Sequence, residues 1–517
     1  MLIVTHYQRK ATMTDVSRLL SAGLLAVALT ACGSTVAARP GAVAAGGSAP
    51  VVNGLGAPAP ATSGPPGVAT APGAVPGLGG GTSTGTAGGA PTRTLPGGGT
   101  STGTTGTSTG TAANRSPIKI GIIYVNNDSG ASSAGINNGN TFTPRRAYEA
   151  LVSAYNARGG VAGRHINPVY VELKSSSTSL KADIEAGCNT FTQDQHVAAV
   201  LGGTGIYSED LSDCLAKART PQISGDYALG DSDSLKRAPY LLQPVTLTVD
   251  DRARLMLERL TTAGRVTAKD KLGIVVEGCP FDQRAYTRTV QPTAKRLGLT
   301  IAQKVEARCF GDIRDLGGQA SDMQSAVLKF QTNGVNKVLF VSGSVESNML
   351  LYFATAAESQ SYHPGYALTS AAAAALQEAN TPKAQLANAV GLGWMPSLDS
   401  SRVPPLLPAG RSCLQDLQKA AGLTPQGPAD RVYAFGACDT VGLYDAALRA
   451  THGNPDVAGV LASVAALRTG FAGATSYGER TDFSAGRRTG PAQGRIFAWS
   501  TACTCFDYTG SPVSLTN

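Results

Sequence analysis

Short apolar runs alternate with helical segments beyond residue 116, and this alternation restricts the possible folds more than any other feature. The first run, IKIGIIYV at 118–125, suits a strand buried on both faces of a sheet. Thr143-Pro144 then predicts the start of a helix, and Gly159-Gly160 predicts its end. Further strands are expected near residues 166–173, 197–202, 221–224, 272–277, 300–307, 337–342 and 365–369.

Strands and helices in this alternation predict an α/β fold with doubly wound parallel sheets. The 402 residues beyond position 115 exceed what one such sheet needs. We therefore expect two lobes, each with its own sheet.

The segment before the first strand has a different composition. Residues 33–115 contain 22 of the 62 glycines and no Asp, Glu or Lys, and the hexamer GTSTGT recurs at positions 81, 99 and 106. Such a sequence has too few apolar side chains to bury a core. We expect residues 32–115 to form a disordered tether.

The N-terminus has the pattern of an export signal. Arg9, Lys10 and Arg18 precede an apolar run at 19–29, which is too short to span a bilayer as a stable helix. The run ends in LTACG, which resembles the lipobox of bacterial lipoproteins and predicts removal of residues 1–31 and lipidation of Cys32. Two or more acyl chains would anchor the protein on the outer face of the membrane. The alternative is an ordinary signal peptide in which Cys32 has no role, and Met13 is an alternative start.

The net charge of +8 does not indicate a nucleic-acid partner. Five of these charges fall in residues 1–115, and the remainder of the chain has 37 Lys and Arg against 34 Asp and Glu. Because phosphate binding requires clustered basic residues, a nucleic-acid-binding function is disfavoured.

Six sequence blocks carry a family resemblance. They follow the opening strand and comprise residues 156–172, 197–204 (VAAVLGGT), 220–224 (TPQIS), 271–277 (KLGIVVE), 334–340 (GVNKVLF) and 444–448 (YDAAL). In this order and at these separations they resemble extracytoplasmic solute-binding proteins of ABC transporters, of the leucine/isoleucine/valine-binding type. The resemblance covers roughly residues 116–510.

The resemblance implies the type I periplasmic-binding-protein fold, a two-lobed clamshell that closes on a small ligand without catalysis. Three crossovers near 244–250, 390–398 and 475–485 are expected to join the lobes. The first lobe then comprises residues 116–246 and 393–478, and the second comprises 247–392 and 479–517.

The ligand-binding residues are expected where strands give way to helices, because loop amides and helix N-termini there can hold an anion. In the family, the first-lobe positions supply hydroxyl and amide groups to a ligand carboxylate. The residues implied for this chain are Thr204, Gly205, Tyr207, Ser208, Ser224, Asp226 and Tyr227 from the first lobe, and Glu277, Phe281, Ser344, Glu346 and Ser370 from the second. Alternatively, Thr204 and Ser208 are helix caps, and Glu277 and Glu346 are solvated surface acids.

Eight cysteines of the folded part are consistent with disulfide bonds in an oxidising compartment. We expect neighbours to pair in order, because each of the first three separations can bridge a helix to the next βα element. The pairs are Cys188 with Cys214, Cys279 with Cys309, Cys413 with Cys438, and Cys503 with Cys505. The first resembles a disulfide of the family's first lobe, whereas the last closes a short, strained ring, so that pairing elsewhere stays open.

The function predicted from these features is capture of a small polar solute, an amino acid, amide or related carboxylate, for an ABC importer. The partners are the permease subunits and, through the lipid anchor, the membrane; the protein is expected to be monomeric, without cofactor or metal. One alternative is a ligand sensor or cell-surface interaction protein on the same fold. Another is a dinucleotide-dependent enzyme, because Gly203-x-Gly205-x-x-Ser208 follows a strand and Asp226 lies about twenty residues further on.

Overall fold

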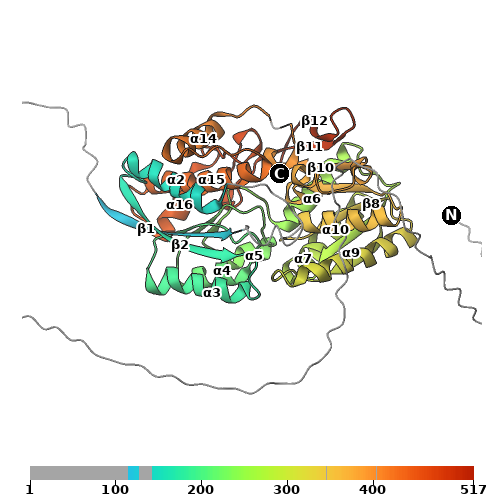
Figure 1. Cartoon of the computed structure of the whole chain (residues 1–517), viewed down its shortest axis with the longest axis horizontal. Helices are drawn as coiled ribbons and strands as arrows, with labels where there is room; N and C mark the ends of the chain where they lie inside the picture. Colours follow the sequence, from blue (N-terminus) through green and yellow to red (C-terminus); the bar gives the residue numbers. More distant parts are fainter. Residues whose placement is uncertain (1–114, 127–141, 345, 403, 517) are drawn as a thin grey trace, which may run out of the picture. The chain divides into compact units, whose positions relative to one another are not determined.

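The computed structural model describes residues 115–126, 142–344, 346–402 and 404–516 (Figure 1). The predicted signal peptide, the predicted lipidation site Cys32 and residues 33–114 of the predicted tether lie outside the described residues, whereas Arg115 is the first residue of β1 (Arg115–Asn126). Within the described ranges, no helix combines the length and the apolar character needed to cross a bilayer.

The first sheet has five parallel strands in the order β2-β1-β3-β4-β5. Its strands are β1 (Arg115–Asn126), β2 (Arg164–Lys174), β3 (Val200–Gly202), β4 (Gln222–Ser224) and β5 (Leu241–Leu242). Helices cover both faces: α2 (Pro144–Ala157), α14 (Pro408–Ala421), α15 (Pro428–Ala450) and α16 (Val457–Leu467) belong to one side, and α3 (Leu180–Asn189) and α4 (Glu209–Lys217) to the other (Figure 1). The short α5 (Ser232–Arg237) precedes β5.

The apolar run of β1 explains why both faces are covered. Ile120, Ile122 and Tyr124 pack in the core with α2 and α15, whereas Ile123 packs with α3 and α4. Because successive side chains of a strand point to opposite faces, a continuous apolar run buries both sides. We refer to this sheet and its helices as lobe 1.

The second sheet has seven strands in the order β12-β11-β10-β9-β8-β6-β7. They are β6 (Lys271–Glu277), β7 (Thr300–Ala307), β8 (Lys337–Val341), β9 (Gly365–Thr369), β10 (Ala389–Gly393), β11 (Gln493–Ser500) and β12 (Cys505–Ser514). One face packs against α6 (Val249–Thr262), α7 (Pro280–Ala285) and α8 (Gln291–Arg296), and the other against α9 (Asp315–Thr332) and α10 (Glu346–Ser359). The short helices α11 (Ala374–Gln377), α12 (Lys383–Leu386) and α13 (Pro396–Asp399) flank β10, and we refer to this sheet and its helices as lobe 2.

The two-lobed α/β architecture predicted from the alternation is confirmed, with one difference in the second sheet. The eight strands expected from apolar runs correspond to β1–β4 and β6–β9. The second sheet differs from a parallel sheet at one edge, where β11 runs antiparallel to β10 and to β12. Only a short turn joins β11 to β12, and a connection of that length permits antiparallel pairing alone.

Four disulfide bonds connect these elements in the pairs of neighbours that the sequence analysis expects. The first, Cys188–Cys214, joins α3 to α4, and the third, Cys413–Cys438, joins α14 to α15. Cys279–Cys309 joins the start of α7 to the segment after β7. Cys503–Cys505 lies in the turn between β11 and β12.

Candidate functional site

A cavity of about 590 Å³ lies between the two lobes at the carboxyl ends of their strands. Lobe 1 contributes the ends of β1 and β2, the loops after β3 and β4, and the start of α15. Lobe 2 contributes residues after β7, the start of α10 and residues 375–380. Ligand sites of open α/β sheets lie at these strand ends, and this volume is in the range of small-molecule sites.

The cavity wall is apolar over large parts of both lobes. Apolar side chains come from Val125, Leu180, Ile206 and Val432 in lobe 1 and from Phe310, Ile313, Leu316 and Leu376 in lobe 2. Uncharged polar residues lie between them in both lobes, at Ser175, Ser177, Thr204, Tyr227, Gln426 and Tyr433 in lobe 1 and at Ser344, Ser347, Asn348, Gln377 and Asn380 in lobe 2. Such a wall suits a ligand with an apolar body and few polar groups.

Five of the residues expected from the sequence line this cavity. Four belong to lobe 1, namely Thr204, Gly205, Asp226 and Tyr227, and Ser344 belongs to lobe 2. The two loops that follow β3 and β4 thus meet the lobe 2 wall, as the strand-end argument predicts.

Three other lobe 1 residues differ from the expectation, because their side chains serve the protein's own structure. Ser208 caps α4, its Oγ accepting a hydrogen bond from Asp210 N at 3.2 Å, which is the alternative role considered above. Ser224 Oγ accepts from Asp226 N at 3.3 Å. The ring of Tyr207 packs edge-on against Phe281, with 5.3 Å between ring centroids, and neither ring lines the cavity.

The remaining lobe 2 candidates, Glu277, Glu346 and Ser370, are also absent from the cavity wall. All three are buried, which excludes the surface-acid alternative for both glutamates. Glu346 accepts hydrogen bonds from Thr369 N at 3.2 Å and Thr369 Oγ1 at 2.8 Å. Ser370 Oγ accepts from the backbone of Trp394 and Met395. They lie at strand ends, as predicted, but they hold neighbouring loops together instead of facing the cleft.

Much of the wall comes from segments that the sequence analysis did not identify. The segment 310–316 follows β7 and was accessible to the same strand-end argument. Residues 426–433, by contrast, belong to the start of α15, far along the chain from the other lining residues. No local pattern marks them, because only the packing of α15 on lobe 1 brings them to the cleft.

A buried charge cluster supports the lobe 2 wall from behind. Glu277 accepts hydrogen bonds from Phe310 N at 2.7 Å and from Ser342 Oγ at 2.6 Å, and Asp282 accepts from Gly343 N at 2.6 Å. Burial raises the pKa of Glu277 to about 7, and burial together with the charge of Glu277 raises the pKa of Asp282 well above its ordinary value. These two carboxyl groups fix the backbone beside the lining residues Phe310 and Ser344.

We expect Glu277→Gln to flatten the pH dependence of stability. The ordinary pKa of this carboxyl is 4.5 and burial raises it to about 7, so the folded chain retains a proton that the unfolded chain releases between these values. The free energy of unfolding therefore falls as pH rises, by about 2 kcal/mol between pH 5.5 and pH 8 for this group, at about 1.4 kcal/mol per pKa unit. Glutamine removes the titration; its Oε1 can still accept from Phe310 N, and its Nε2 would donate to Ser342 Oγ in place of accepting from it. Urea unfolding of both proteins at the two pH values measures the difference, and identical slopes would contradict the assignment.

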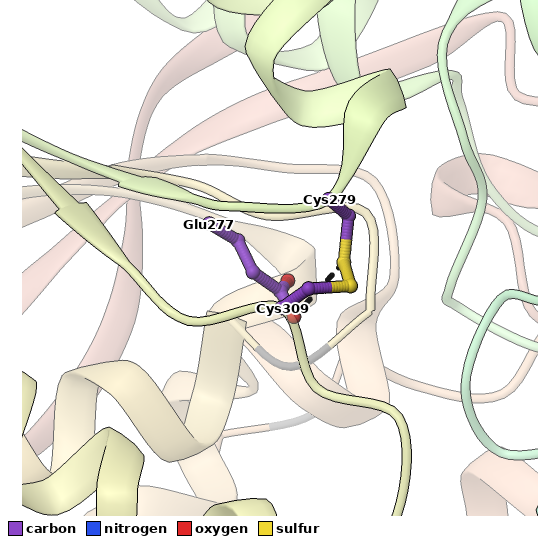
Figure 2. Close-up of side chains that lie close together, drawn as sticks. All are labelled: Glu277, Cys279 and Cys309. Carbon is purple, nitrogen blue, oxygen red and sulfur yellow. Dashed lines mark hydrogen bonds between the residues drawn. A yellow bond between two sulfur atoms is a disulfide. The ribbon is translucent and has the colours of Figure 1, made fainter.

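Glu277, Cys279 and Cys309 place potential metal-ligand atoms within 4.8 Å of one another. Figure 2 shows, however, that the two sulfur atoms are joined as a disulfide beside the Glu277 carboxyl. A disulfide lacks the thiolates that bind metal ions in such sites. The Cys279–Cys309 pair is therefore a structural disulfide next to the cleft.

A family model described as periplasmic binding protein matches residues 117–502, nearly the whole described part of the chain. The chain belongs to the periplasmic binding protein family. This is a family of binding proteins, and the cleft of this binding protein lies inside the matched region. A search of curated proteins finds no match.

Solved structures support the fold of this binding protein. The solute-binding protein of an ABC transporter from R. palustris, in complex with 4-hydroxybenzoate, superposes with a TM-score of 0.56 at 14% identity, covering 77% of this chain and 97% of that one. The branched-chain amino acid transporter substrate-binding protein LivJ from Streptococcus pneumoniae, in complex with isoleucine, gives 0.53 at 14% identity, covering 77% and 99%. A fatty acid ABC transporter substrate-binding protein from Thermomonospora curvata gives 0.51 at 17% identity, covering 78% and 92%.

Proposed function

We propose that this chain is a lipid-anchored extracytoplasmic substrate-binding protein that delivers a small solute to the permease of an ABC importer. The observation that supports this proposal most directly is the cavity of about 590 Å³ lined by both lobes. A ligand that contacts both lobes stabilises the closed state relative to the open one. Hinge crossovers are proposed near 244–250 and 475–485. The crossover expected near 390–398 falls within β10 and α13 of lobe 2, so we place it between α13 and α14 instead.

The solute is proposed to have a substantial apolar body. The rings and aliphatic chains of Phe310, Ile313, Leu316 and Leu376 form one wall of the cleft. Structural relatives hold 4-hydroxybenzoate and isoleucine, and a third is named for fatty acids, so this fold accommodates apolar bodies of different shape. The relevant class is therefore amphipathic small molecules rather than highly polar solutes such as sugars.

Binding is tested by the thermal and urea stability of the full-length chain in the presence of amino acids, amides, amines, aromatic acids and short fatty acids. A compound present at 100 times its dissociation constant is expected to add about 2.7 kcal/mol to the free energy of unfolding. Gly427→Phe is the matched control, because Gly427 lines the cavity and a Cβ added there meets no atom within 4 Å. The phenyl ring should fill part of the cleft and abolish the ligand effect while the variant remains folded. If no compound stabilises the wild-type chain, the proposed function is contradicted.

The anchor is tested separately through Cys32. In Cys32→Ala the thiol that would carry the acyl chains is absent, so the protein is expected to move from the membrane fraction to the soluble exported fraction. Cell fractionation with an antibody to the folded part measures this change. Membrane association equal to that of the wild type would exclude the lipid anchor but not solute binding.

A further inference from the structure

The backbone amides expected to hold a ligand carboxylate are occupied by a side chain of the protein itself. Thr204 N and Gly205 N both donate to Oδ2 of Asp226, at 2.7 and 3.2 Å. The loop accommodates this carboxylate closely, since a Cβ on Gly203 would lie 2.0 Å from Asp226 Oδ1. Asp226 thus fills the anion-binding position at the lobe 1 wall.

The amide of Gly203 and the hydroxyl of Thr204 are also used internally. Gly203 N donates to the carbonyl oxygen of Ile123 at 3.0 Å, and the Thr204 hydroxyl donates to the carbonyl oxygen of Ile206. Amide groups of residues 203–205 are therefore not available to a ligand carboxylate, nor to the pyrophosphate that the dinucleotide alternative requires.

The charged residues that line the cavity also disfavour a ligand carboxylate. Three lining residues are acids, Asp226, Asp312 and Asp430, and the lining contains one basic residue, Lys174, within the part of the chain that the structure describes. Asp312 is paired with Arg314, at 2.5 Å, and Asp430 Oδ2 accepts from Gln426 N at 2.9 Å. In the described ranges, Asp226 has no paired cation comparable to Arg314, and its Oδ1 has no hydrogen-bond donor.

We propose that the cleft selects ligands whose head group donates hydrogen bonds, a carboxamide or an ammonium, and discriminates against a carboxylate at the lobe 1 wall. A donor head group can bind the free oxygen of Asp226, whereas a carboxylate placed there would face a second negative charge in a site largely removed from water. This inference rests on the proposed function and narrows its ligand class to amphipathic amides and amines.

The experiment compares head groups on a constant apolar body. Isothermal titration of the full-length chain uses phenylacetamide, phenethylamine and phenylacetate, and a second series with a 4-methylpentyl body. The amide and the amine are expected to bind at least tenfold more tightly than the carboxylate of the same series. A carboxylate that binds as tightly as its amide overturns the selectivity but leaves solute capture intact. If none of the six probes binds, the proposed function and this inference both fail.

Asp226→Asn removes the charge and retains an acceptor for the loop amides. We expect at least tenfold weaker amine binding, less than threefold change for the amide, and stronger carboxylate binding. A merely structural role of Asp226 would instead lower the affinity for all three head groups together. Asp312→Asn is the matched control, because Arg314 already neutralises that carboxylate, and its head-group preference should stay within twofold of the wild type.

Discussion

Replacing Arg252 by leucine is expected to lower the free energy of unfolding by about 3–5 kcal/mol, the range measured when one partner of a buried ion cluster is removed. Arg252 is only 2% exposed and interacts electrostatically with Glu346, Asp282 and Glu277. Its guanidinium also donates to the carbonyl oxygens of Tyr227, at 3.3 Å, and Ser342. Without this cation, three buried acids would lack their common positive partner.

The matched control lies two residues further along the same helix. Arg254 also contacts two acids, Asp251 and Glu258, each at 3.0 Å, but its side chain is 26% exposed. Because water screens such pairs, Arg254→Leu should cost no more than about 1 kcal/mol. The cost of Arg252→Leu should also shrink at pH 5.5, where the buried acids can take up protons. Urea unfolding of both variants at pH 8 and pH 5.5 measures these differences, and equal losses at pH 8 would refute the importance of the buried cluster.

The fold was predictable because its signal is local and periodic. The run at 118–125 is apolar on both faces, and that pattern alone specifies a strand covered by helices on two sides. The antiparallel hairpin of β11 and β12 was not predicted, because the apolar run of β11 is only four residues long, IFAW at 496–499, and β12 shows no clear alternation. Several residues of β11 (Gln493–Ser500) are only partly buried, and β12 forms the edge of the sheet.

The candidate site was less predictable than the fold. Thr204, Asp226 and Ser344, which were expected from their strand-end positions, line the cleft. Strand-end position could not distinguish them from Glu346 and Ser370, which occupy equivalent positions but accept hydrogen bonds from neighbouring loop residues. Tertiary contacts decide whether a polar side chain at a strand end faces the cleft or the adjacent loop. A single sequence shows no pattern from which these contacts can be predicted.

The two disulfides Cys279–Cys309 and Cys188–Cys214 close loops of similar length, with sequence separations of 30 and 26 residues. On the chain-entropy model, replacing either pair by alanine should cost about 3–4 kcal/mol of stability. The effects on ligand binding should nevertheless differ. Cys309 directly precedes Phe310, the first residue of the lobe 2 wall segment 310–316, whereas the α3–α4 disulfide lies in the helical layer of lobe 1 outside the cavity lining.

We therefore expect the Cys279→Ala/Cys309→Ala variant to bind ligand at least fivefold more weakly than the wild type, because segment 310–316 must then be ordered when the ligand binds. The Cys188→Ala/Cys214→Ala variant should bind within twofold of the wild type. Unfolding titrations and calorimetric binding of the same probe, at a temperature where both variants are folded, measure the two effects independently. Equal affinity losses in the two variants would mean that segment 310–316 is held by its packing and by the hydrogen bond from Phe310 N to Glu277, and not by the Cys279–Cys309 disulfide.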